Sequence, residues 1–157
     1  MPGKVILLSV KPQYADMILK GVKSVELRRV KPKYIEKGSL ILLYASSPVK
    51  SIVGAFSVDS VAQEPLDKLW EMVKNKSGVT YKEYMKYFKD VKKGVGIFIN
   101  DYWKLHKPIS LDFIKQKMVS FYPPQSFMYT TEEDMLSLHT ETLEDLKIKY
   151  NNSLALD

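Results

Sequence analysis

Three residue types are absent or scarce in this sequence of 157 residues, which has no cysteine, two histidines and two arginines. Without cysteine the chain has no disulfide, no thiolate metal ligand and no cysteine nucleophile, and such a composition suits a reducing, cytoplasmic compartment. His106 and His139 alone are too few for a multi-histidine metal centre. We therefore expect no metal, no cofactor and a cytoplasmic location.

Long apolar runs are also absent. No N-terminal segment is apolar for long enough to be a signal peptide or a membrane-spanning helix, so we expect no membrane partner. The composition, 45% hydrophobic and 27% charged, is that of an ordinary soluble protein, and the length suffices for one domain with a buried core. The net charge of +6 favours an anionic partner, nucleic acid first, although many lysine-rich proteins are basic for solubility alone.

The two arginines are neighbours, Arg28 and Arg29, whereas lysine supplies the positive charge everywhere else. Solubility does not depend on which cation a surface carries. A planar, bidentate donor is needed where a side chain must hold a phosphate, a carboxylate or a base edge. The alternative is that two arginines fell together by chance in a lysine-rich chain.

The residues around the two arginines alternate as in a β-strand, because the apolar Val25 and Leu27 lie two positions apart. If the polar face of this strand lines a cleft, Glu26 orients Arg28, which then presents donors to an anion. If that face meets solvent, the two charges form only a weak surface ion pair. The predicted strand runs from Lys23 to Arg29, with Ser24, Glu26 and Arg28 on one face and Lys23, Val25, Leu27 and Arg29 on the other.

Elsewhere, the patterns predict strands that are not regularly separated by helices, which argues against a doubly wound sheet. Predicted strands cover residues 5–10, 40–44, 51–61 and 94–105. Predicted helices start near Pro12, Pro65, Thr80 and Thr131, the third with a capping box. The fold class is therefore α+β, a small mixed β-barrel of about five or six strands decorated by three or four helices. We expect this barrel over residues 1–130 and a helical extension of the same domain over residues 131–157.

Two loops carry candidate ligand-binding groups. Ser46 and Ser47 lie in a turn of small residues whose backbone donors can take an anion, although most such turns have no ligand. Lys11 ends the first strand, so that we expect it near the polar face of the strand that holds Arg28.

A late aromatic segment, residues 121–129, is stiffened by two prolines and carries one amide and one hydroxyl, those of Gln125 and Ser126. Its aromatic side chains can stack on a base at little entropic cost, or can close the end of a barrel, and the two roles are compatible. A second aromatic stripe, in the helix that starts at Thr80, is more typical of a core than of a stacking platform. The stacking wall is predicted to consist of Tyr122, Phe127 and Tyr129.

Several of these segments, in the right order, resemble the ASCH domain, a family named for activating signal cointegrator homology that has a PUA-like β-barrel fold. The resemblance covers residues 4–129. Its most specific part is the spacing Gly-x-Lys-x-x-Glu-x-Arg from Gly21 to Arg28. The other matching segments are residues 6–12, residues 44–48, the long strand after Gly54 and residues 123–126.

The resemblance implies a cleft that binds RNA or a nucleotide, with Lys23, Glu26 and Arg28 at the family's lysine, glutamate and arginine positions. Some bacterial members resemble amidohydrolases of acylated cytidine that use a lysine and a threonine of this motif with a later glutamate. Here Glu26 stands in place of that threonine and Ser24 is out of register with it, which argues against that activity. Other members are described as nucleases.

Three functions stay open. The first is a binding module for RNA or a nucleotide, in which Arg28 holds a phosphate and Glu26 accepts from an exocyclic amine. The second is a hydrolase or ribonuclease acting on RNA or modified nucleosides, with Lys23 as a base, Glu26 as its partner and Ser24 or Ser46 as a nearby nucleophile. The third is a regulatory domain that contacts other proteins.

Overall fold

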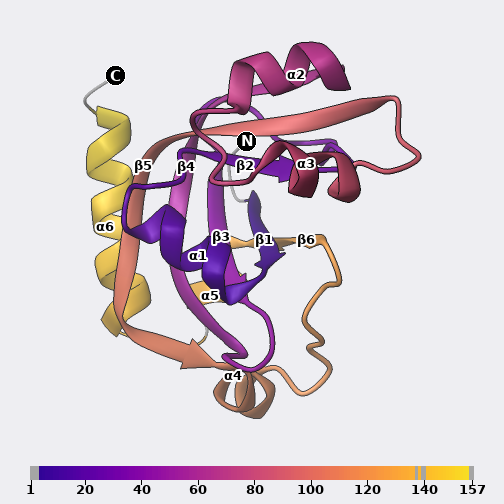
Figure 1. Cartoon of the computed structure of the whole chain (residues 1–157). Helices are drawn as coiled ribbons and strands as arrows, with labels where there is room; N and C mark the ends of the chain where they lie inside the picture. The colour runs from indigo at the N-terminus through magenta and orange to yellow at the C-terminus, as the bar shows by residue number, and fades with distance from the viewer. Residues whose placement is uncertain (1–3, 137, 139–140, 156–157) are drawn as a thin grey trace.

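The computed structural model describes residues 4–136, 138 and 141–155, and within these residues the chain forms six strands and six helices (Figure 1). The strands are β1 (Lys4–Val10), β2 (Val25–Arg28), β3 (Leu40–Ala45), β4 (Ser51–Pro65), β5 (Lys93–Ser110) and β6 (Phe127–Thr131). The helices are α1 (Pro12–Leu19), α2 (Leu66–Val73), α3 (Tyr81–Tyr87), α4 (Leu111–Lys117), α5 (Glu132–Leu136) and α6 (Glu141–Ala155).

All six strands belong to one sheet in the order β2-β5-β4-β3-β1-β6. β1 and β3 run parallel, and every other neighbouring pair is antiparallel. The sheet is therefore mixed, and the α+β class predicted from the sequence is confirmed.

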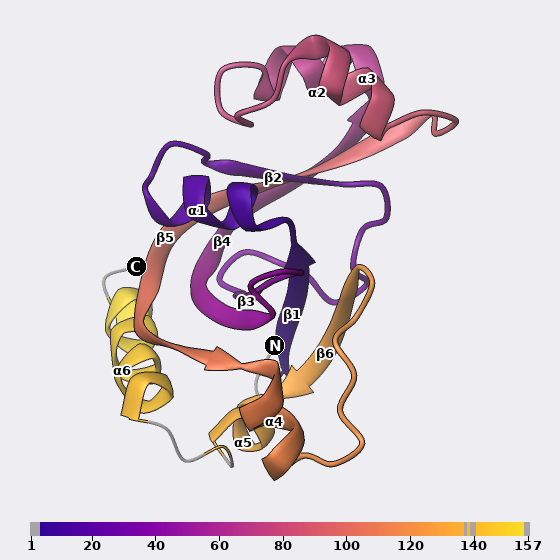
Figure 2. The same cartoon turned by 60° about the horizontal axis from the view of Figure 1, so that its bottom comes forward.

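The long strands β4 and β5 give the sheet its curvature. They have 15 and 18 residues, and their pairing shifts register at three places between Ile52 and Ser60. Register shifts of this kind bend a strand and increase its twist. As a result the sheet curls, and its two edge strands turn towards the same side of the molecule (Figure 2).

Helices cover both faces of the curled sheet. In β1 successive side chains enter different clusters: Leu7 packs with residues of α4, α5 and α6, whereas Leu8 packs with residues of α1. Burial of both faces explains why β1 and β3 are continuously apolar in sequence rather than alternating. A third cluster packs α2 and α3 over β2 and includes Val25, Leu69 and Tyr84.

Among the described residues, strand pairing does not close the sheet into a barrel, because β2 and β6 remain its edges. The predicted α+β class with a mixed sheet stands, but closure of that sheet into a barrel is not found among the described residues. The physical reason lies at β2, which has four residues and pairs only with β5. On its other side, Leu27 N donates to the Glu26 carboxylate and Leu27 O accepts from the Tyr87 hydroxyl, so side chains occupy the positions that another strand would need.

The four predicted helices are present as α1, α2, α3 and α5, and the Thr80–Glu83 capping box at α3 is confirmed. The sequence prediction contains no helix at α4. It places α6 within the helical extension over residues 131–157 but gives no bounds for it, because the apolar positions of α6 are weakly periodic. Leu143 and Leu146 of α6 belong to the same buried cluster as Leu7. Residues 137, 139–140 and 156–157 of the proposed extension lie outside the described part, and the division at residue 130 stays a prediction.

Gly54 provides a test of how tightly the curled sheet packs. A Cβ at this position would lie 2.6 Å from the Trp103 carbonyl oxygen and 2.6 Å from a methyl carbon of Leu19. Backbone cannot move aside as a flexible side chain can, so Gly54→Ala should lower the free energy of unfolding by about 1–3 kcal/mol. At Gly96 the nearest atom, of Leu69, would be 3.3 Å away, so that Gly96→Ala should be tolerated better in the same urea denaturation series. Equal losses would contradict the packing described here.

Candidate nucleic-acid interface

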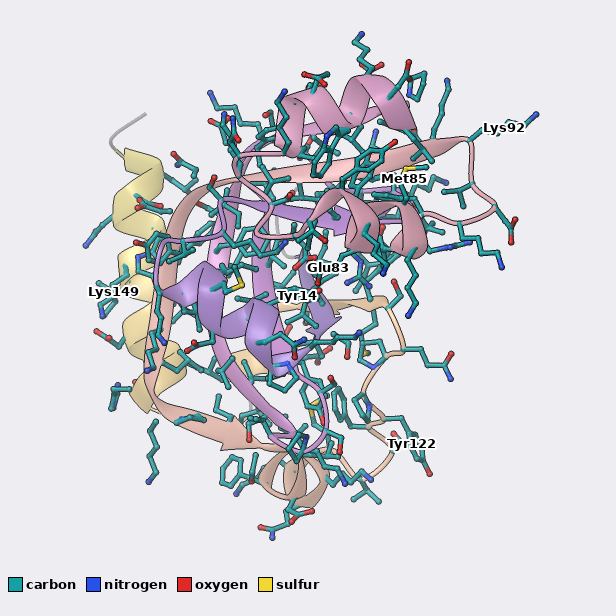
Figure 3. All side chains as sticks on the ribbon, viewed as in Figure 1. Tyr14, Glu83, Met85, Lys92, Tyr122 and Lys149 are labelled. Carbon is teal, nitrogen blue, oxygen red and sulfur yellow. The ribbon has the colours of Figure 1, made fainter. Side chains whose placement is uncertain are left out.

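A cleft of about 660 Å³ opens beside β2, on the side of that strand which has no neighbouring strand. It lies between α1 and α3, and Figure 3 shows Tyr14 of α1 close to Glu83 of α3. The residues that line it are Ser9, Val10, Lys11, Tyr14, Lys23, Glu26, Leu27, Arg28, Ser46, Val79, Glu83, Tyr84, Lys86, Tyr87 and Gln125.

Glu26 and Arg28 enter the cleft together because they are two residues apart in a strand. Their exposed fractions are only 5% and 9%, although burial of charged groups is costly unless they are paired and hydrogen-bonded. Their hydrogen bonds therefore indicate what holds each of them in place.

Arg28 is held by the far side of the curled sheet. Its Nη1 donates to Ser9 O of β1 at 3.2 Å, and its Nη2 donates to the Ser126 hydroxyl, just before β6, at 2.7 Å. The guanidinium of an edge strand thus bridges to the strands at the opposite edge. Its Nε is buried and has no hydrogen-bond partner among the described residues.

Glu26 is only half satisfied. Its Oε1 accepts from Leu27 N at 3.0 Å, whereas its Oε2 is buried without a partner in the described part of the chain. The cleft therefore contains one unsatisfied acceptor and, on Arg28, one unsatisfied donor. A buried group of this kind costs about 1–3 kcal/mol unless a ligand or water meets it.

Lys23 completes the buried charges, with 2% of its surface exposed. Its Nζ donates to Ser77 O and lies 5.1 Å from the centre of the Tyr14 ring. Burial lowers the pKa of Lys23 from its ordinary value, and the nearby charge of Glu26 opposes that shift. The result is an amine that loses its proton more readily than an exposed lysine does.

The phenols of the cleft keep their protons. Burial raises the pKa of Tyr14, and the charges of Glu83 and Glu26 raise it further. Burial likewise raises the pKa of Tyr87, whose hydroxyl donates to Leu27 O at 3.1 Å. At the mouth, hydrogen bonds from Thr80 lower the pKa of Glu83, with a smaller contribution from Lys11.

The structure brings most of the predicted site residues together. Lys23 was expected on the opposite face of the strand, but β2 begins only at Val25, and a turn bonded to Met17 O directs Lys23 into the cleft. Ser126 does not line the cleft but holds Arg28 from behind. The predicted site residues that line the cleft are Lys11, Lys23, Glu26, Arg28, Ser46 and Gln125.

Besides Ser126, three predicted residues lie outside the cleft. Ser24 precedes β2 and is exposed, and Ser47 is exposed in the turn after β3. Tyr122 is 76% exposed, and its ring is covered by Lys115 rather than facing the cleft. The expected wall is not there because Phe127 and Tyr129 pack against each other, with ring centres 5.8 Å apart.

The aromatic lining comes instead from α1 and α3, as Tyr14, Tyr84 and Tyr87. Tyr84 belongs to the aromatic stripe that the sequence assigned to the core, and it is indeed fully buried. Tyr14 and Tyr87 had no signal of their own, since only the packing of α1 and α3 beside β2 directs them into the cleft.

Arg29 points away from Arg28, as alternation in a strand requires. Its Nη1 donates to Tyr87 O and Lys89 O, each at 2.9 Å, at the end of α3. The two adjacent arginines therefore have different tasks, one inside the cleft and one on the surface.

The sequence model of the ASCH domain matches residues 8–111, and the chain belongs to the ASCH domain family. It is 30% identical over 135 residues to a Zymomonas mobilis protein named ASCH domain-containing ribonuclease. The aligned residues are 86% of this chain and 90% of that protein. The crystal structure of ASCH from Zymomonas mobilis matches with a TM-score of 0.79 and 29% identity, over 85% of this chain and 92% of that one.

A more distant likeness concerns the fold alone. The N-terminal domain of Staphylothermus marinus McrB has a TM-score of 0.56 at 13% identity, over 88% of this chain and 93% of that domain. Together with the family match, the solved structures confirm the predicted ASCH, PUA-like α+β fold.

Two further features are absent from the described residues. Within them, no helix has the length and apolar character to cross a membrane. No three histidine, aspartate or glutamate side chains in the described ranges lie together so as to hold a metal ion.

The bridge made by Arg28 predicts unequal effects of two equivalent substitutions. Arg28→Lys loses the planar fork that reaches Ser9 and Ser126, so the free energy of unfolding should fall by about 1.5–3 kcal/mol. Arg29→Lys replaces an exposed donor and should cost less than about 1 kcal/mol. Urea denaturation of both variants measures this, and a larger loss for Arg29→Lys would reverse the assignment.

Burial of Lys23 predicts a pH dependence of stability. Since the pKa of Lys23 is lowered from 10.5 in the folded protein, the unfolded chain binds more protons at this site between the lowered pKa and 10.5. The contribution of Lys23 to the free energy of unfolding therefore rises with pH across that window, and the cost of burying its charge is greatest at pH values below the window.

Lys23→Met removes this titration. Its free energy of unfolding relative to wild type should be most favourable at low pH and should become less favourable as the pH rises towards 10.5. Denaturation at a series of pH values measures the difference. In the matched control Lys20→Met, an exposed lysine paired with Asp16, the difference should not follow this course. A difference independent of pH for both variants would contradict the shift.

Proposed function

We propose that this protein is a ribonuclease that binds single-stranded RNA in the cleft and cleaves it there. The observation that carries the proposal is a pair of buried atoms in that cleft without a hydrogen-bond partner among the described residues, Glu26 Oε2 and Arg28 Nε, beside the buried amine of Lys23. Such groups favour a ligand that offers both donors and acceptors and that carries negative charge, as a nucleotide does.

The similarity to a protein named as a ribonuclease supports the enzyme alternative over the binding module. The similarity covers 86% of this chain and 90% of that protein, so it is not confined to a short motif. The binding module and the protein-interaction domain become the outcomes that the experiment must separate.

The proposed chemistry uses the 2′-hydroxyl of RNA as the nucleophile. Lys23 Nζ, in its neutral form, takes the proton of the 2′-hydroxyl while the 2′-oxygen forms a bond to phosphorus. The bond from phosphorus to the 5′-oxygen breaks, and that oxygen takes a proton from the ammonium of Lys11 at the cleft mouth. The products are a 2′,3′-cyclic phosphate and a 5′-hydroxyl, so atoms and charges balance.

The other groups position and stabilise. Arg28 Nε donates to a non-bridging phosphate oxygen, whose charge grows as phosphorus becomes five-coordinate. Glu26 Oε2 accepts from an amino group of the base, and its charge keeps Lys23 basic enough to act. The aromatic face of Tyr14 or Tyr87 is available to the base.

The test is cleavage of a single-stranded RNA oligonucleotide in the presence of EDTA, with products identified by mass spectrometry. We expect a cyclic phosphate end and no cleavage of the 2′-deoxy oligonucleotide of the same sequence. Lys23→Gln should lower kcat by about 10²–10⁴-fold because it removes the general base. The exposed Lys20→Gln is the matched control and should leave kcat unchanged. Since the neutral amine is the active form, kcat should rise with pH through the pKa of Lys23.

Other results would overturn the proposal. Cleavage of the deoxy oligonucleotide would exclude the 2′-hydroxyl as nucleophile. Saturable RNA binding without any product would favour the binding module. Full activity of Lys23→Gln would remove Lys23 from the reaction even if RNA is cut.

A further inference from the structure

A basic surface beside the cleft is not used by the proposed chemistry. It is built from α3, the turn after α3 and the start of β5, together with the residue that follows β2. We call it the lysine ridge. Its members are Arg29, Lys82, Lys86, Lys89, Lys92 and Lys93, all of which are exposed.

The ridge adjoins the cleft, and hydrogen bonds connect its segments to one another. Lys86 lines the cleft, and Lys82 lies one helical turn away on the same face of α3. Arg29 binds the backbone at Tyr87 and Lys89, which fixes the end of β2 against the end of α3. In Figure 3, Lys92 extends from the turn between α3 and β5, away from the centre of the molecule.

The charges of the ridge are not neutralised by neighbouring acids. In the described part of the chain, none of its six side chains forms an ion pair, whereas Lys20, Lys68, Lys74 and Lys149 each pair with a carboxylate three or four residues away. The two acids of this stretch are Glu83 and Asp90, and Glu83 is occupied by the capping box with Thr80. The ridge therefore keeps a positive potential at the mouth of the cleft.

Two aromatic residues of the same helix, α3, are partly exposed. Tyr81 of α3 is 56% exposed, and Tyr87, which lines the cleft, is 38% exposed. A positively charged track with aromatic side chains on which bases stack is the arrangement that holds single-stranded nucleic acid without sequence preference. An acidic protein or a lipid surface would use the charges but not the rings.

We propose that the lysine ridge is the path of the RNA strand that flanks the cleavage site, so that the substrate is a single strand several nucleotides longer than the cleft accommodates. This inference rests on the proposed function. The phosphates outside the cleft lie along the ridge, and the reacting phosphate lies in the cleft. The ridge contributes to the affinity for long RNA and leaves the chemical step unchanged.

The experiment compares two triple variants of the full chain, each of which removes three positive charges. The ridge variant is Lys82→Gln, Lys89→Gln and Lys92→Gln. The control is Lys104→Gln, Lys107→Gln and Lys117→Gln, which are exposed lysines of the second half of β5 and of α4. Helix α4 lies at the end of the molecule away from α3 (Figure 1). Binding and cleavage are measured with single-stranded RNA of about 4 and about 16 nucleotides, the range of site sizes in single-strand binders.

For the longer RNA, the ridge variant should bind about tenfold more weakly at low salt. Its slope of log Kd against log salt should fall by about 0.7 for each RNA phosphate that the ridge no longer neutralises. KM should rise while kcat stays the same, and the short RNA should be bound and cut as by wild type. The control variant should change neither. Melting temperatures confirm that both variants are folded.

Equally weak binding of the longer RNA by the two triple variants would overturn the proposal, because only the net charge of the protein would then matter. So would an unchanged KM for the longer RNA, or double-stranded RNA bound as tightly as single-stranded RNA. If wild type cleaves the short RNA, and the ridge variant binds and cleaves the longer RNA as wild type does, the proposal for the ridge is overturned and the proposed function stands. If wild type neither binds nor cleaves RNA, both fail.

Discussion

The structure depends on how the free side of β2 is satisfied. A strand at the edge of a sheet has unpaired backbone groups, and here the curl of the sheet turns that edge inwards, where water cannot easily serve them. Side chains serve them instead: the Glu26 carboxylate accepts from Leu27 N, and the Tyr87 hydroxyl donates to Leu27 O. Because side chains rather than a neighbouring strand meet these backbone groups, no strand fills the space beside β2, and that space is the cleft.

Arg28 connects the two sides of that gap. Its bonds to Ser9 and Ser126 reach from one edge of the sheet to the strands at the other edge, so one guanidinium replaces a ladder of backbone bonds. A lysine, with a single point of charge, cannot make both contacts in a fixed geometry. Nε of the same side chain is buried and has no hydrogen-bond partner among the described residues, so Arg28 links the stability of the curled sheet to the capacity of the cleft for a ligand.

The buried charges gain functional meaning from being close together. Burial lowers the pKa of Lys23, and the negative charge of Glu26 beside it makes that decrease smaller. Groups with perturbed pKa values in a cleft are frequent at reactive sites, although ion pairs that serve only structure shift pKa values too. In this cleft Glu26 Oε2 and Arg28 Nε are both buried without a hydrogen-bond partner among the described residues, which an arrangement for stability alone would avoid.

The sequence by itself determined the α+β class, four of the six helices, the alternation that places Glu26 and Arg28 on one face, and the opposite direction of Arg29. These follow from local rules, since capping, apolar periodicity and the two-residue repeat of a strand depend on near neighbours.

Only the tertiary structure decided that the sheet stays open, that Lys23 turns into the cleft ahead of β2, and that Tyr14 and Tyr87 rather than Tyr122 provide its aromatic lining. Each of these depends on segments far apart in the chain that pack against one another, and long-range packing leaves no periodic trace in sequence. For a related reason the sequence did not predict α4, and it predicted α6 only as part of a helical extension without bounds. A short helix and a weakly amphipathic one gain most of their stability from the surface they cover, here the outer face of the curled sheet.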